Sequence, residues 1–233
     1  MGAIYRKELR SYFYSPVGYI FAALMLGIAV IFGWPAIQAQ YAMIDSIIYP
    51  IVYVSVIACA IMSMRSFADE RAKKTDQLLL TSPISLTEIV LGKYLAVLTI
   101  MGCIIAVSFL IPLIMMFFGE PPMAEFITKY IGLFLVVAVF TANGVFISSL
   151  TESQVAAAVV SAFINFLLCL LSALISLLSS GAWTDVFTQF SVLDRMVKFS
   201  NGVINVVDVV FYLSVVFILL FLTVRSLERR RYQ

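Results

Sequence analysis

The sequence contains no histidine and few charged residues. Of its 233 residues, 12% are Asp, Glu, Lys or Arg and 63% are hydrophobic. Soluble globular proteins carry about 25% charged residues, so too little polar material remains here to surround a soluble core. The lack of histidine removes the commonest general base and the commonest metal ligand. These absences exclude soluble domains, histidine-dependent catalytic triads and the usual zinc sites, and they indicate an integral membrane protein.

Two further absences concern energy and chemistry. No Asp, Glu, Lys or Arg lies at the middle of any apolar stretch long enough to cross a membrane, which disfavours proton or sodium coupling and intramembrane catalysis. The sequence also has no G-x-x-x-x-G-K-[ST] phosphate-binding loop, so nucleotide hydrolysis by that route is excluded in this chain. We therefore expect no catalytic residues, no metal site and no cofactor here, and any ATP-driven work would need a partner.

Six stretches are long enough to span a bilayer, because a helix needs about 20 apolar residues to cross about 30 Å of hydrocarbon. They are 17–37, 46–64, 94–118, 130–151, 154–179 and 205–225. The last contains Asp208 about one turn from its outer end, where a carboxylate can reach headgroups or water. The predicted fold class is an all-α integral membrane protein with one six-span transmembrane domain over residues 1–233.

The distribution of basic residues predicts the orientation, since Lys and Arg are retained on the cytoplasmic side. With the N-terminus inside, twelve basic residues lie in cytoplasmic segments, whereas only Lys129, Arg195 and Lys198 lie outside. The cytoplasmic set is Arg6, Lys7, Arg10, Arg65, Arg71, Lys73, Lys74, Lys93, Arg225, Arg229, Arg230 and Arg231. We predict both termini inside, with a basic cytoplasmic tail over 226–233.

Residues 1–16 have the pattern of an amphipathic helix at the membrane surface. At 100° per residue, the apolar and basic side chains fall on opposite halves. The apolar half contains Ile4, Tyr5, Leu9, Tyr12 and Phe13, and the basic half contains Arg6, Lys7 and Arg10. The pattern fits a helix that only anchors the first span to anionic lipid and, equally, a helix that also contacts a partner.

The segment 65–90, between spans two and three, has three predicted parts. Residues 65–74 carry charges of both signs and favour a continuation of span two into the cytoplasm. Thr75 and Asp76 can cap a short helix through Gln77 to Leu80, which Pro83 ends. Its adjacent residues Leu78, Leu79 and Leu80 would be exposed outside the bilayer, which is typical of a docking surface rather than a solvated connector. A capping-box pattern from Ser85 to Glu88 then begins the third span.

Few polar residues lie inside the spans. Asn143 and Asn165 are the strongest hydrogen-bonding groups there, and they fit either bonds between helices or the lining of a substrate path. Cys59, Cys103 and Cys169 lie in separate apolar runs, so we expect them to pack against lipid or neighbouring helices. Between spans five and six, 181–204 alternates aromatic and polar residues, which indicates amphipathic helices in the outer interface that act as a lid or as an anchor.

Several motifs together resemble the permease subunit of ABC-2 type transporters, particularly its gliding-motility GldF-like branch. The most specific are 64–71 (MRSFADER), 78–85 (LLLTSPIS) and 88–94 (EIVLGKY). Further similarity lies in 5–9 (YRKEL), 15–19 (SPVGY), 148–154 (SSLTESQ), 199–205 (FSNGVIN) and the Arg-rich end. The chain reads Lys73, Lys74 and Thr75 where the family often has Ser-Gly-Thr.

The resemblance implies a subunit of an ATP-driven, exporter-like transporter in a bacterial cytoplasmic (inner) membrane. Its partners would be an ATP-binding subunit, which would hold ATP and magnesium, and a second permease copy or paralogue; no nucleic acid is expected. The residues implied to couple to the ATPase are Glu70, Arg71, Thr75, Asp76, Gln77, Leu78, Leu79, Leu80 and Pro83. Residues 1–16 would form an interface helix through Tyr5, Arg6, Lys7, Leu9 and Arg10, and 181–204 an outer re-entrant hairpin. The alternative is a membrane scaffold or sensor that docks a soluble partner without transport.

Overall fold

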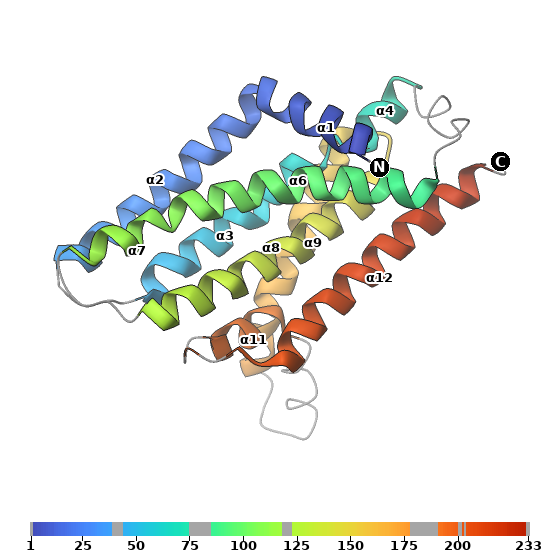
Figure 1. Cartoon of the computed structure of the whole chain (residues 1–233). Helices are drawn as coiled ribbons and strands as arrows, with labels where there is room; N and C mark the ends of the chain where they lie inside the picture. The colour runs from blue at the N-terminus through green and yellow to red at the C-terminus, as the bar shows by residue number, and fades with distance from the viewer. Residues whose placement is uncertain are drawn as a thin grey trace.

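The computed structural model describes residues 2–38, 44–74, 85–117, 123–177, 191–199, 202 and 204–231. Every regular element in these ranges is a helix (Figure 1). The helices are α1 (Gly2–Tyr14), α2 (Pro16–Gln38), α3 (Ile44–Ser63), α4 (Ala68–Ala72), α6 (Leu86–Ser108), α7 (Leu110–Met115), α8 (Met123–Leu150), α9 (Gln154–Leu177), α11 (Val192–Lys198) and α12 (Val206–Arg231). The all-α prediction is confirmed over the described part of the chain.

Six of these helices, α2, α3, α6, α8, α9 and α12, are long and apolar enough to cross a membrane. They match the six predicted spans in order, and the largest shifts are at four ends. The third span, predicted to reach 118, is divided at Phe109, where α6 ends at Ser108 and α7 follows. Helix α8 begins at Met123 rather than 130, α6 begins at Leu86 rather than 94, and α12 continues to Arg231 rather than ending at 225. The predicted basic tail is therefore a continuation of the last span over most of its length.

The bundle has two ends with different elements. At one end lie α1, α4 and the C-terminal end of α12, where Arg230 Nη2 donates to the Leu150 carbonyl oxygen at 3.2 Å (Figure 1). We call this the α1 end. At the opposite end, the α11 end, α11 lies beside the first turns of α8 and α12.

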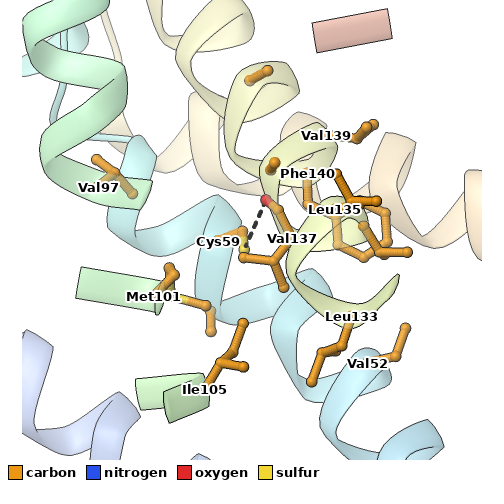
Figure 2. Close-up of a cluster of buried hydrophobic side chains, with 14 of the residues drawn as sticks. Val52, Cys59, Val97, Met101, Ile105, Leu133, Leu135, Val137, Val139 and Phe140 are labelled. Carbon is orange, nitrogen blue, oxygen red and sulfur yellow. Dashed lines mark hydrogen bonds between the residues drawn. The ribbon is translucent and has the colours of Figure 1, made fainter. Parts of the chain in front are cut away.

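Helix α8 forms the centre of the bundle. It packs against α3, α6, α9 and α12, and 83% of its most apolar window is buried, against 22% for α12. Figure 2 shows the contact of three helices, where Cys59 of α3 and Met101 of α6 face Val137 of α8. The exposed apolar faces of the outer helices are suited to lipid, because hydrocarbon is as apolar as their side chains.

Gly144 allows α3 and α8 to approach closely. A Cβ atom at this position would lie 1.8 Å from Ser63 Oγ and 2.8 Å from Ser63 Cβ. Real Cβ atoms do not come this near, so any larger residue would push the two helices apart. The absence of a side chain at Gly144 thus fixes the spacing at which the core of α3 meets α8.

The expected continuation of span two through 65–74 is wrong. Helix α3 ends at Ser63, and a turn over 64–67 leads into the separate short helix α4. The reason is Ser148 of α8, whose Oγ accepts from the backbone N–H groups of Phe67 at 3.0 Å and Ala68 at 3.1 Å and donates to the Met64 carbonyl oxygen at 2.9 Å. These bonds satisfy the backbone groups that a continuous helix would have paired.

Candidate functional site: a shared lysine at the α1 end

Lys93 is a buried cation near the start of α6. Its side chain is 2% exposed, and its Nζ lies 3.1 Å from Glu8 Oε1 on α1 and 2.8 Å from Glu70 Oε1 on α4. The same Nζ donates to the Ser66 carbonyl oxygen at 2.5 Å. An ammonium has three N–H donors, and here three acceptors from three parts of the chain use them. We call Lys93, Glu8 and Glu70 the lysine cluster.

The lysine cluster ties α1, α4 and α6 together. Both carboxylate side chains are mostly buried, at 16% exposed for Glu8 and 17% for Glu70, and the Phe67 ring centre lies 5.0 Å from the ammonium. Removing one partner of a buried ion pair costs about 3–5 kcal/mol, because the remaining charge is left unpaired. The three helices are therefore expected to move as one unit rather than separately.

Helix α4 is also fixed to the turn between α8 and α9. Arg71 donates from Nη1 to the Ser149 carbonyl oxygen at 3.1 Å and pairs through Nη2 with Glu152 at 3.2 Å. Gln154, the first residue of α9, donates from Nε2 to Asp69 Oδ1 at 2.7 Å. Glu70 and Arg71, both predicted from the sequence as coupling residues, thus point to different partners, one toward α1 and α6 and the other toward α8 and α9.

Most of the predicted coupling residues lie outside the described part of the chain. These are Thr75, Asp76, Gln77, Leu78, Leu79, Leu80 and Pro83. The chain is described up to Lys74, whose φ of 54° turns it sharply, and again from Ser85. Ser85 Oγ accepts from the Glu88 backbone N–H at 3.3 Å, which confirms the predicted start of the helix. Both ends of this segment therefore lead directly into elements that hold the lysine cluster.

Helix α1 has the predicted amphipathic character, with one exception. Leu9 packs partly buried against the core, Tyr12 is buried, and Tyr5 forms a 3.1 Å hydrogen bond with Thr99 of α6. Burial raises the pKa of the Tyr12 hydroxyl above its ordinary value, so it remains a neutral donor to the Met62 carbonyl oxygen at 2.7 Å. Phe13, expected on the packed face, is 52% exposed.

The basic residues of α1 lie on its free face. Arg6, Lys7 and Arg10 are exposed, and no carboxylate of the described residues pairs with them. Glu8 is the acidic residue of this helix and falls, at 100° per residue, between Ile4 and Tyr12 on the packed face. That position in an apolar arc is the signal in the sequence for a buried partner of Glu8.

Asn143 and Asn165 are brought together in the middle of the bundle. Asn143 Nδ2 donates to Asn165 Oδ1 at 2.8 Å, and Asn165 Nδ2 donates to the Val56 carbonyl oxygen at 3.4 Å. Both side chains are buried, and together they link α8, α9 and α3. The observed geometry is that of hydrogen bonding between helices.

The α11 end contains two other ion pairs. Arg195 of α11 pairs with Asp208 of α12, and its guanidinium lies 4.1 Å from the centre of the Phe211 ring. Lys129 of α8 pairs with Asp45 of α3. Asp208 is only 1% exposed, so the expectation that it reaches headgroups or water is wrong. Arg195 lies close enough to neutralise it inside the protein.

These features define a polytopic helical membrane protein whose polar contacts concentrate at the two ends of the bundle. Residues 21–224 match the sequence profile of a family described as ABC-2 family transporter protein, and the chain belongs to that family. It is therefore a membrane permease of an ABC transporter, a transmembrane type of subunit that works with an ATP-binding subunit. The matched region excludes α1. No curated protein matches the chain.

Proposed function

We propose that the chain is the permease subunit of an exporter-like ABC-2 transporter and that it receives mechanical work through residues 75–84. In this proposal a separate ATP-binding subunit holds ATP and magnesium, and Leu78, Leu79 and Leu80 dock into it. The observation that carries the proposal is the lysine cluster. It joins α4, which precedes the segment, to α6, which follows it, so a push on the segment reaches both helices and α1.

The work would act by shifting an equilibrium between two arrangements of the helices. ATP binding closes the ATPase dimer, which presses on 75–84 and, through Lys93, carries α1 and α6 with it. Such a shift requires a difference in affinity between the two arrangements. The bonds from Arg71 and Gln154 to the α8–α9 turn and to α4 extend the same motion to α9.

The proposal also covers the cellular location, the orientation and the second permease subunit. The excess of basic residues supports a cytoplasmic location of both termini, α1 and α4 in a bacterial cell, and the motifs around Arg71 and Lys93 favour the GldF-like branch. Helix α1 then serves as the interface helix, and 181–204 as an outer hairpin. A second permease copy or paralogue completes the pathway, with Asn143 and Asn165 between the helices that form it.

Co-purification with the genomic neighbours in mild detergent tests this function. Wild type should capture an ATPase, and the variant Leu78→Ser/Leu79→Ser/Leu80→Ser should lose it while keeping its elution volume and melting temperature. Replacing the same three residues by Val keeps the surface apolar and should retain capture. Capture of an ATPase that the Ser variant retains would contradict docking through the leucines. A soluble partner without ATPase activity would favour the scaffold alternative.

A further inference from the structure

An apolar groove lies where α1 and α2 meet the outward face of α6. It has a volume of about 190 Å³ and is bounded by all three helices, with almost no polar surface. Its walls include Tyr12, Phe13, Ala22, Cys103, Ile104 and Val107. The groove is open along one side rather than enclosed, and the neighbouring surface of α2 is formed by exposed apolar side chains such as Ile20 and Leu24. Such a groove can take part of a hydrocarbon chain from the surrounding membrane, with the rest of the chain lying along the exposed apolar surface of α2.

Helix α1, which lines one end of the groove through Tyr12 and Phe13, also carries exposed arginines. Phe13 lines the groove, and Arg6 and Arg10 lie within about 60° of it around the helix at 100° per residue. Both arginines are exposed, and neither has an ion-pair partner among the described residues. The Arg10 guanidinium lies 5.5 Å from the ring centre of Tyr14, which is 76% exposed. Exposed Tyr and Arg beside apolar surface are typical of the headgroup level of a membrane.

We propose that this groove, the lipid groove, binds one acyl chain of an anionic phospholipid whose phosphate is held by Arg6 and Arg10. An apolar chain fills the groove between α2 and α6, and two cations of α1 that pair with no carboxylate of the described residues complement a net negative headgroup. A zwitterionic lipid offers the same chain without the net charge. The proposal depends on the membrane location of the chain and not on coupling to an ATPase, so the two can fail separately.

Cys103 reports occupancy of the lipid groove. It is exposed and lines the groove, whereas Cys59 and Cys169 are buried. Purified protein in detergent is treated with N-ethylmaleimide, with phosphatidylglycerol or phosphatidylcholine of identical acyl chains added. Phosphatidylglycerol should slow modification of Cys103 at concentrations where phosphatidylcholine has little effect. Equal protection by both lipids overturns the headgroup assignment, and no protection overturns the site. Protection of Cys103 could also rise with protein concentration in the absence of lipid. That result would assign the groove to a second copy of the chain and would overturn the lipid proposal.

Charge variants test the headgroup site. Arg6→Gln and Arg10→Gln should each raise the phosphatidylglycerol concentration needed for half-protection about fivefold, since a basic residue near an anionic surface is worth about 1 kcal/mol. Arg229→Gln is the matched control, because Arg229 is exposed on α12, outside the groove. An equal effect of Arg229→Gln means that only the net charge of the protein acts, which contradicts a site.

A filled groove tests the acyl-chain site. Cys103→Phe adds bulk inside the groove at an exposed position, so folding should be kept, and Leu213→Phe is its control on the exposed face of α12. Native mass spectrometry should show retained phosphatidylglycerol lost in Cys103→Phe and kept in Leu213→Phe. The lipid could instead be retained in both Phe variants and lost only in Arg10→Gln. That result would mean that the headgroup alone holds the lipid at the surface, and it would overturn the acyl-chain site in the groove.

Discussion

The two ends of the bundle both contain buried ion pairs, but they are built differently. At the α1 end, one lysine on α6 is shared by carboxylates of α1 and α4. At the α11 end, the two described ion pairs are separate: Arg195 pairs with Asp208 and joins α11 to α12, and Lys129 pairs with Asp45 and joins α8 to α3. Each of these pairs connects two helices, whereas the lysine cluster connects three. The first arrangement makes three helices depend on one side chain, whereas the second divides the same task between independent pairs.

In the proposed mechanism, this difference favours the α1 end as the end that transmits motion. A charge shared among three helices is expected to move them together, and its loss should release all three. A separate pair links two helices and does not couple a third to them. The lysine cluster includes a residue of α4, which precedes the segment 75–84, and a residue of α6, which follows it. In the proposed orientation, the α1 end therefore connects this cytoplasmic segment to three helices.

The largest expected effect is that of Lys93→Met. The variant leaves Glu8 and Glu70 buried without this cation, so the free energy of unfolding should fall by about 3–5 kcal/mol. The measurement is thermal or denaturant unfolding of purified protein in detergent. A fall below about 1 kcal/mol would show that α1 and α4 do not depend on Lys93.

A compensated variant is the control for that result. Adding Glu8→Gln and Glu70→Gln to Lys93→Met removes the unpaired charges and should restore most of the lost stability, because neutral groups of similar shape are tolerated in such sites. Continued instability of the triple variant would mean that the packing of the lysine stem, rather than its charge, holds the three helices.

The sequence predicted those parts of the fold that depend on nearby residues. The six spans follow from apolar length, the helix start at Ser85 from the spacing to Glu88, and α1 from its periodicity. The break after Ser63 was missed because it depends on Ser148, more than 80 positions away along the chain. The partners of Lys93 were missed for the same reason, since only folding brings Glu8 to α6.

At the α11 end, Asp208→Asn should have a smaller effect than Lys93→Met. The amide keeps the shape of the carboxylate, and Arg195 keeps its contact with the Phe211 ring. Leaving Arg195 without its anion should lower the free energy of unfolding by about 1–3 kcal/mol. The same unfolding measurement checks this, with Glu152→Gln at an exposed side chain as a control for the loss of one negative charge. An effect as large as that of Lys93→Met would remove the contrast between the two ends.

Combining variants from both ends tests their independence. Glu8→Gln and Asp208→Asn lie at opposite ends of the bundle and share no partner, so their effects on the free energy of unfolding should add within about 0.5 kcal/mol. A double-mutant cycle measures the difference. A coupling above about 1 kcal/mol would mean that the core of α8 carries strain from one end to the other.

The smallest expected effect concerns Glu152, which also touches α4 but differs from Glu70 in exposure. Its side chain is 78% exposed, and its partner Arg71 keeps a second bond to the Ser149 carbonyl oxygen. Exposed ion pairs contribute little, because water and salt screen them. Glu152→Gln should therefore change the free energy of unfolding by less than about 0.5 kcal/mol, and Glu70→Gln should cost clearly more in the same measurement. If the two substitutions cost the same, α4 is held by the α8–α9 turn as firmly as by Lys93, and the motion of the 75–84 segment would reach α9 directly rather than through α6.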